Sequence, residues 1–249
     1  MANIPGREIM SFETKDFFNY PQYLSKKFLE TSEDVNTKDK SSFETHNLEC
    51  GYYTVTFCPE TENYCLGMVD MVDSTKISAT LGNDRMSRYY QIFLNSMSKI
   101  LNKFDGKVVK NIGDCLLYYF PVCKIKNPED YLIKSLECSF AMIESHDFIC
   151  QYLKKETLPC LDYRISMDYG NVTLMKSSDS ASIAMIGTPI NMCAKINRKA
   201  STNGIVVGGD IREMLKKVHR YEFEEIDGYS IGLKLDYPIY VVRRNGIFF

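Results

Sequence analysis

The stretch YCLGMVDMVDST, residues 64–75, predicts the fold of the chain around it. Residues 64–72 are almost continuously apolar, as expected of a central strand that is covered on both faces. Asp70 interrupts this apolar run shortly before a helical stretch, residues 74–104. Because a carboxylate buried alone is costly, a carboxylate at the end of a core strand indicates a partner of opposite charge.

A second carboxylate is placed in a similar way. In KNIGD, residues 110–114, Asp114 lies at the predicted tip of a hairpin between two apolar strands, and two such tips can be neighbours in one sheet. Paired carboxylates repel each other unless a cation lies between them, and hard divalent cations with oxygen ligands are the usual solution. Taken separately, an Asp before a helix and a Gly-Asp turn are more often structural.

Together, Asp70 and Asp114 favour a metal site for two Mg²⁺ or Mn²⁺ ions, which could serve both ends of an in-line displacement. Met71 is assigned to the same metal site, although its side chain is expected to fill the core. The helix that begins after Asp73 offers free backbone N–H groups and a favourable dipole end to a triphosphate. Ser74 and Thr75 open this helix and are therefore candidate substrate-binding residues.

Strands and helices alternate along the chain, with hairpins among the strands. We therefore expect an α+β fold of ferredoxin-like type, with a mixed, mostly antiparallel sheet and helices packed mainly on one face. The expected strands are residues 52–57, 64–72, 106–112, 115–120, 205–207, 221–226 and 238–243, with a strand pair in 162–175 bent at Gly170-Asn171. The expected helices are residues 74–104, broken near Gly82-Asn83 with Asp84 as a second N-cap, 128–155, 189–200 and 210–218.

The N-terminal part of the sequence differs in composition from the rest. Residues 31–45 are polar, charged and rich in Ser and Thr, as expected of a linker, and residues 17–29 could form one short helix. We divide the chain into an extension, residues 1–50, and a globular domain, residues 51–249. The N-terminus lacks the pattern of a signal peptide, and no apolar run reaches the roughly 18 residues of a membrane-spanning helix.

Charge and cysteine content restrict the partners and the compartment. Thirty Lys and Arg residues against 32 Asp and Glu leave a net charge of −2, so we expect neither nucleic acid nor a membrane as a partner. Nine Cys residues include no CxxC pair and several lie in apolar runs, so we expect reduced thiols and a cytoplasmic protein. His46, Cys50 and Cys58 have no defensible zinc-site spacing. His146 and His219 are assigned no role.

At four segments, in the family's order, residues 62–243 resemble the class III adenylate and guanylate cyclase catalytic domain. Asp73 stands where this family usually has Gly, and Asp168 or Tyr169 where it has His. The segments are VDMVDST (69–75) for the first metal motif, KNIGD (110–114) for the second, YRISMDYG (163–170) for an Arg-Ile-Gly-Ile-His-x-Gly strand, and GTPINMCAK (187–195) for Gly-x-x-Val-Asn-x-Ala-x-Arg.

The resemblance implies a lyase that converts a nucleoside triphosphate into a 3′,5′-cyclic mononucleotide and pyrophosphate by two-metal attack of the 3′-hydroxyl. It also implies a homodimer whose two active sites are shared across the interface. One subunit would supply the metal ligands Asp70 and Asp114, and Arg164 resembles a phosphate-contacting Arg. The residues assigned to the other subunit are Lys110 towards the base, Asn191 towards the ribose and Lys195 where an Arg normally stabilises the pentavalent phosphorane.

Two positions bear on substrate and rate. Lys110 resembles the base donor of adenylate cyclases and favours ATP, but Ala184 stands where the family's second adenine contact is an Asp or Thr, unless Ser180 or Ser182 takes that role. Lys195 keeps a charge but lacks the planar fork of Arg. The alternatives are a pyrimidine cyclase of a defence system, acting on UTP or CTP, and a catalytically weakened nucleotide-binding module that regulates a partner.

Overall fold

The computed structural model describes residues 54–121, 128–178, 183–230 and 236–245. All of them belong to one compact unit, Cys50–Phe249. The predicted extension, residues 1–50, and its helix at 17–29 lie outside the described residues. Within the described ranges, no helix combines the length and the apolar character needed to cross a membrane.

The central strand is β1 (Val55–Met71), whose first part is exposed and whose last part is buried. It pairs antiparallel with β3 (Cys115–Phe120) on one side and β4 (Tyr163–Ser177) on the other. The two strands predicted at residues 52–57 and 64–72 are therefore one strand, and this prediction was wrong. Its pairing with β4 shifts between Phe57 and Thr61, around Pro59, which cannot donate a ladder hydrogen bond, so the strand continues past an irregularity.

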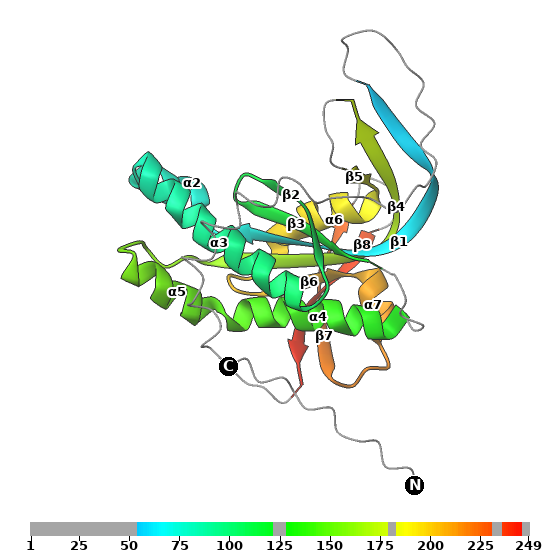
Figure 1. The fold of residues 1–249 in the computed structure, drawn as a ribbon. Coiled ribbons are helices and arrows are strands. Elements are labelled where there is room, and N and C mark those ends of the chain that lie inside the picture. Colours follow the sequence, from blue (N-terminus) through cyan, green and yellow to red (C-terminus); the bar gives the residue numbers. More distant parts are fainter. Residues whose placement is uncertain (1–53, 122–127, 179–182, 231–235, 246–249) are drawn as a thin grey trace. The chain divides into compact units, whose positions relative to one another are not determined.

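The sheet is mixed and mostly antiparallel, as predicted (Figure 1). Its strand order is β2-β3-β1-β4-β6-β8-β7, with β5 paired to β4. The β4–β6 pairing is parallel, and the other described pairings are antiparallel. The remaining strands are β2 (Lys107–Ile112), β5 (Ile183–Ile186), β6 (Ile205–Gly208), β7 (Tyr221–Ser230) and β8 (Asp236–Arg244).

One hairpin differs from the sequence prediction. The chain does not turn back into a second strand at Gly170-Asn171, because both residues continue the β4 ladder along β1, opposite Tyr64 and Asn63. Gly170 instead allows a close approach, since a Cβ there would lie 3.0 Å from Cγ of Pro189. The hairpin partner of β4 is β5, a strand that the sequence reading missed.

The helices also show two corrections. The helical stretch 128–155 is two helices, α4 (Pro128–Glu144) and α5 (His146–Lys155), separated at Ser145, whose hydroxyl donates to the Met142 carbonyl. The predicted break near Gly82-Asn83 is confirmed, but α3 is capped at Gly82, so Asp84 lies in the first turn. The other helices are α2 (Ser74–Thr80), α3 (Asn83–Lys103), α6 (Thr188–Ile196) and α7 (Gly209–Leu215), with a 3₁₀ turn at Asn197–Lys199.

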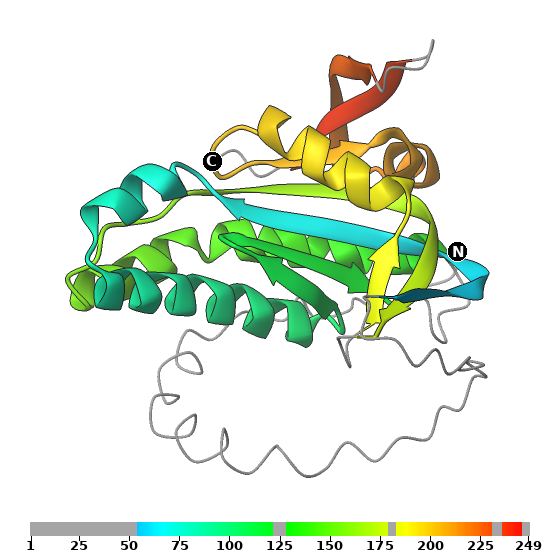
Figure 2. The ribbon, with the colours of Figure 1, turned by 90° about the horizontal axis from the view of Figure 1, so that it is seen from above.

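Side chains of β1 alternate between two covered faces. Cys65 faces α4, where its thiol contacts the hydroxyl of Ser135 at 3.2 Å. Leu66 and Met68 instead pack in a cluster with Cys193 of α6. Figure 2 shows α6 on one side of β1 and β4, with α3 and α4 on the other. Because Asp70 continues the alternation of Leu66 and Met68, its side chain belongs to the α6 face.

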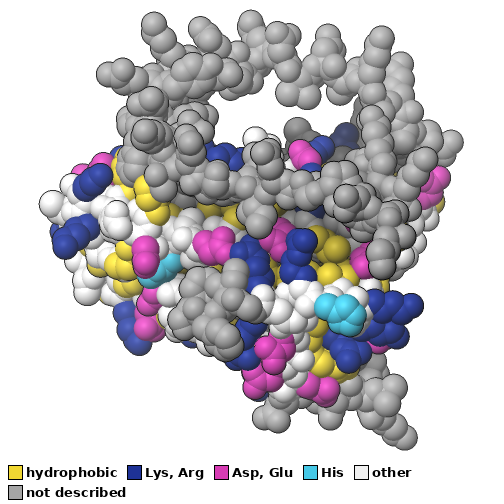
Figure 3. Space-filling model, turned by 90° about the horizontal axis from the view of Figure 1, so that it is seen from below, with side chains coloured by type: hydrophobic (Ala, Val, Ile, Leu, Met, Phe, Trp, Pro, Cys, Tyr) yellow, Lys and Arg dark blue, Asp and Glu magenta, His cyan; other side chains and the backbone are white. Residues whose placement is uncertain are grey.

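The state of the cysteines differs from the prediction of reduced thiols. Cys150 and Cys160 form a disulfide, because the end of α5 and the segment after it bring their Cα atoms within 4.6 Å. The free thiols among the described residues are Cys58, Cys65, Cys115, Cys138 and Cys193. On the face shown in Figure 3, basic and acidic side chains of the described residues are interspersed.

Candidate functional site

The structure brings the two predicted carboxylates together. Asp70, near the end of β1, lies opposite Cys115 in the β1–β3 ladder. Asp114 immediately precedes Cys115, in the turn between β2 and β3. Both carboxylates are partly buried. The strand register therefore places the two predicted metal ligands at one end of neighbouring strands.

The electrostatics of this pair fit a cation. The pKa of Asp70 is raised to about 6, mainly by burial and also by the charge of Asp114, while Arg164 and Arg198 act in the opposite direction. Two neighbouring carboxylates in a partly buried place offer the hard oxygen donors that Mg²⁺ and Mn²⁺ prefer. The residues present therefore fit the divalent cations that the sequence predicted. The side chain of Met71 is only 4% exposed and lies in the core.

Arg164 adds a cationic group beside the pair. It lies opposite Asp70 in the β1–β4 ladder. Its Nε is buried and has no hydrogen-bond partner among the described residues. A buried donor without a partner is costly, so this guanidinium suits an anionic ligand bound near Asp70.

Asn197 holds the two strands beneath the site, a role that the sequence did not suggest. Its side-chain amide donates to the carbonyls of Met68 on β1 and Arg164 on β4, each at 3.3 Å. Asn197 is 3% exposed. The one sequence signal is a polar side chain on the buried face of a helical stretch, at the position after Ile196.

The chain turns sharply between Asp70 and α2. Asp73 is in the left-handed region at φ 55°, which Asp tolerates better than most residues, and it stands at the position where a Gly was expected from the resemblance. Ser74 and Thr75 then form the first turn of α2. Both residues predicted to bind substrate therefore follow Asp70 closely in the chain.

The predicted residues of α6 share one surface. Asn191 and Lys195 are exposed and one helical turn apart, opposite the buried side chains of Met192 and Cys193. Arg198 follows about one turn later, and its charge reaches Asp70. This exposed strip carries the two residues that were assigned catalytic roles.

The two positions that the resemblance assigns to base reading are sequence neighbours of residues that line one pocket. Lys110 is exposed on β2, and Ala184 lies on β5 opposite Met175. The pocket of about 150 Å³ is lined by Tyr64, Val108, Val109, Tyr119, Leu174 and Met185. Ser180 and Ser182, the alternatives to Ala184, lie outside the described residues.

The predicted site residues thus form separate groups within one chain. Asp70, Asp114 and Arg164 are neighbours at the ends of β1, β3 and β4, with Ser74 and Thr75 following. Lys110 lies on β2, and Asn191 and Lys195 lie on the exposed strip of α6.

Comparison with known families agrees with this arrangement. The model of the adenylate and guanylate cyclase catalytic domain matches residues 58–243. The chain belongs to this family. A cytidylate cyclase of Staphylococcus aureus is 24% identical over 196 residues, which cover 76% of this chain and 45% of that protein. The chain therefore matches less than half the length of this relative.

Solved cyclase structures share the fold. The adenylyl cyclase CyaB of P. aeruginosa is 19% identical and superposes with a TM-score of 0.66, covering 76% of this chain and all of that one. The guanylyl cyclase Cya2 is 17% identical, with a TM-score of 0.65 and coverage of 74% and 92%. At these identities the likeness shows the cyclase fold alone.

Asp168 on β4 is one of the two residues, with Tyr169, that the resemblance places where the cyclase motif has His. It is 2% exposed, and it accepts a hydrogen bond from the Tyr237 hydroxyl at 2.7 Å. Gly208 of β6 approaches so closely that a Cβ there would lie 2.1 Å from Oδ1 of Asp168. Burial raises the pKa of Asp168 to about 7. In this cyclase domain Asp168 therefore connects β4 to Gly208 on β6 and to Tyr237 near the start of β8.

Proposed function

We propose that the protein is a nucleotidyl cyclase that converts a nucleoside triphosphate into a 3′,5′-cyclic mononucleotide and pyrophosphate. The observation that carries this proposal is the juxtaposition of Asp70 and Asp114, with Arg164 opposite Asp70. In a family of cyclase domains, two neighbouring carboxylates beside a guanidinium whose buried Nε has no hydrogen-bond partner among the described residues are suited to bind a metal-complexed triphosphate.

Each side chain of the site has a separate proposed role in the reaction. Asp70 and Asp114 would hold two Mg²⁺ or Mn²⁺ ions, which when bound supply activation of the 3′-hydroxyl and charge neutralisation of the phosphates. Arg164, Ser74 and Thr75 would bind phosphate oxygens. Asn191 would orient the ribose so that its 3′-oxygen attacks the α-phosphorus in line, and pyrophosphate leaves.

Lys195 would stabilise the negative charge that develops in the transition state. Because a lysine gives one point charge and no planar fork, we expect a slow reaction. Arg198, one turn further along, adds a second cation to the same side of the site.

We propose that two copies of the chain form the site. Lys110, Asn191 and Lys195 lie on β2 and on the surface of α6, and we assign them to the site of the other subunit. Exposed apolar side chains support the proposal that a second copy of the chain covers this surface. Val108 and Ile112 on β2 are 40% and 49% exposed, and Ile186 on β5 is 45% exposed.

Two observations favour a pyrimidine substrate over the ATP that Lys110 predicted. Ala184 has no hydrogen-bonding group at the second base-reading position, and the relative that matches the chain is named a cytidylate cyclase. Cytosine presents a ring nitrogen and a carbonyl oxygen as acceptors, so an ammonium at Lys110 can serve cytosine as well as adenine. We therefore propose CTP or UTP, with ATP as the second candidate because of Lys110.

The deciding experiment incubates the purified chain separately with ATP, GTP, CTP and UTP in the presence of Mn²⁺ and identifies the products by mass spectrometry. We expect a cyclic pyrimidine nucleotide, lost in Asp114→Asn. Cyclic AMP as the main product would reverse the choice of base. Triphosphate binding without any cyclic product, unchanged in Asp70→Asn, would instead establish a regulatory nucleotide-binding module.

We further propose the division of the chain into an extension, residues 1–50, and a catalytic domain, residues 51–249. Limited proteolysis tests the boundary, since a stable fragment beginning near residue 50 is expected. We place the enzyme in the cytoplasm, where nucleoside triphosphates are available.

A further inference from the structure

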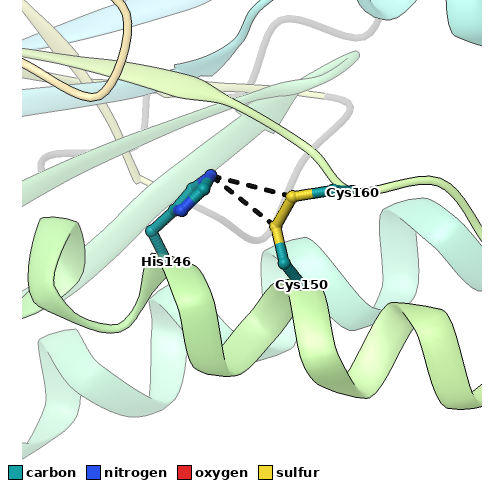
Figure 4. A group of neighbouring side chains, drawn as sticks. All are labelled: His146, Cys150 and Cys160. Carbon is teal, nitrogen blue, oxygen red and sulfur yellow. Dashed lines mark hydrogen bonds between the residues drawn. A yellow bond between two sulfur atoms is a disulfide. The ribbon is translucent and has the colours of Figure 1, made fainter.

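A cluster of metal-ligating side chains lies apart from the carboxylate pair (Figure 4). His146 is the first residue of α5, Cys150 lies one turn later, and Cys160 lies in the segment between α5 and β4. The Sγ atoms of Cys150 and Cys160 are 3.6 and 3.9 Å from Nε2 of His146. The three side chains thus converge on one point from two segments of chain.

Asp162 adds an oxygen donor to this cluster. Its Oδ1 is 2.9 Å from Nε2 of His146 and accepts a hydrogen bond from the amide of Asn203 at 2.7 Å. The same oxygen therefore contacts both His146 and Asn203. The ligating atoms of His146, Cys150 and Cys160 lie within 4.8 Å of one another, and the Asp162 oxygen adjoins the histidine nitrogen. Nitrogen, sulfur and oxygen donors of this kind are typical of zinc.

Carboxylates lie beside both ring nitrogens of His146. Its Nδ1 lies 3.1 Å from Oδ1 of Asp147. Its Nε2, which is 3.6 and 3.9 Å from the two sulfur atoms, lies 2.9 Å from Oδ1 of Asp162. A carboxylate behind a ligating histidine is also the usual outer support of a zinc site.

We propose that, in the dithiol form of this cluster, His146, Cys150, Cys160 and Asp162 bind one zinc ion. Tetrahedral coordination with Zn–N of about 2.0 Å and Zn–S of about 2.3 Å places nitrogen and sulfur about 3.5 Å apart. The observed separations of 3.6 and 3.9 Å come close to that value. The movement that zinc requires is the separation of the two sulfur atoms.

The disulfide and the zinc site are alternative states of the same cysteines. A thiol reductant supplies two electrons and two protons to the disulfide, which becomes two thiols. Zinc then displaces both thiol protons, and two thiolates, one carboxylate and one neutral imidazole give the occupied site a net charge of −1. The proposal does not rest on the nucleotide reaction, and none of its four ligands takes part in it.

The cluster is attached to the strand that carries Asp70. The carbonyl of Asp162 accepts a hydrogen bond from the Val72 amide at 2.8 Å, two residues beyond Asp70. The His146 ring also lies against the Tyr163 ring, with centroids 5.9 Å apart. A metal that fixes Asp162 therefore also braces the end of β1.

The test uses the full chain, reduced with a phosphine, stripped of metal and kept in excess Mg²⁺ to occupy the oxygen-only site. Titration with Co²⁺ is expected to give the intense visible bands of a tetrahedral ion and a thiolate charge-transfer band, one ion per chain, displaced by Zn²⁺. Chain left as the disulfide is expected to show neither. Binding of zinc to the reduced chain should also raise its thermal midpoint.

Matched variants separate this site from other thiols. Cys160→Ser, at an exposed position, should abolish the charge-transfer band, whereas Cys58→Ser, at a free thiol outside the cluster, should leave it unchanged. Asp147→Asn should weaken zinc binding about tenfold, as expected for an outer partner of a ligating histidine. A reduced chain that gives no thiolate band, or a band that survives in Cys160→Ser, overturns the proposal.

Discussion

Asp70 on β1 lies directly opposite Arg164 on β4, and the pKa of this carboxyl is nevertheless raised to about 6. Burial and the neighbouring Asp114 outweigh the guanidinium. Such a balance is unusual for a carboxylate with a cationic neighbour, which ordinarily has a lowered pKa. This balance is consistent with the cation site that we propose, because a divalent cation would favour the ionised form of both carboxyl groups.

Asp114→Asn should therefore lower the pKa of Asp70, because the substitution removes the neighbouring negative charge. We expect this shift in the metal-free chain, followed by NMR titration of the labelled carboxyl. Cyclase activity should fall below detection in the same variant, because one of the two metal ligands is lost. Asp84→Asn, at an exposed position in the first turn of α3, is the control for both measurements.

Asp70→Asn should stabilise the metal-free chain at neutral pH while abolishing activity. The folded-state pKa of Asp70 is above its ordinary value, so the ionised group destabilises the fold, and that cost develops as the pH rises from about 4 to 6. After allowance for solvent screening we expect the free energy of unfolding of Asp70→Asn to be about 1 kcal/mol higher at pH 7. Chemical denaturation of the variant and of the unchanged protein, each in the presence of a chelator, measures this difference. Equal free energies of unfolding at pH 7 would contradict the electrostatic explanation.

Asp168 predicts a pH dependence of the same sign over a wider range of pH. Because burial raises its pKa to about 7, the folded chain binds more protons than the unfolded chain between about pH 4 and 7, and the free energy of unfolding falls across that window. Asp168→Asn should remove roughly 2–4 kcal/mol of this fall, as expected for a buried carboxyl. Denaturation at pH 4.5 and 7.5 tests the difference, with exposed Glu222→Gln as the control.

Much of the fold could be predicted because it depends on local pattern. The apolar run of residues 64–72 gave the central strand, and Gly82-Asn83 gave the break between α2 and α3. The first part of β1 and the whole of β5 could not be delimited in the same way. Residues 55–63 are mostly exposed and β5 is short, so their strand state depends on pairing with distant β4.

The same division applies to the candidate sites. Asp70 and Asp114 could be predicted because each contradicts the apolar pattern around it, which marks it in the sequence alone. His146, Cys150, Cys160 and Asp162 contradict nothing locally, and they meet only because α5 ends and the chain returns to β4. Asn197 escaped prediction for the same reason, since its partners are main-chain carbonyls of β1 and β4.

Lys195→Arg tests the role of the α6 strip in the transition state. A guanidinium can grip two phosphate oxygens where an ammonium offers one point charge, so we expect kcat to rise about tenfold with little change in KM. The matched control is Lys217→Arg, at an exposed position outside the strip. An equal change in both variants would show that Lys195 does not meet the reacting phosphate.

Ala184→Asp tests base selection, and its matched control is Ala184→Val. An added carboxylate at this position could accept a hydrogen bond from the exocyclic amine of adenine, which the present alanine cannot do. We assume that Lys110 and position 184 read the base together, next to the pocket lined by Val109 and Met185. The ratio of kcat/KM for ATP to kcat/KM for UTP should then rise about tenfold in Ala184→Asp. This change corresponds to one hydrogen bond of about 1.4 kcal/mol. Ala184→Val adds volume without a polar atom and should lower kcat/KM for all four triphosphates alike. If the ratio of kcat/KM for ATP to that for UTP changed equally in both variants, the size of the side chain at position 184, and not its hydrogen bonding, would determine the preference. The base would then have to be read by residues other than Lys110 and position 184.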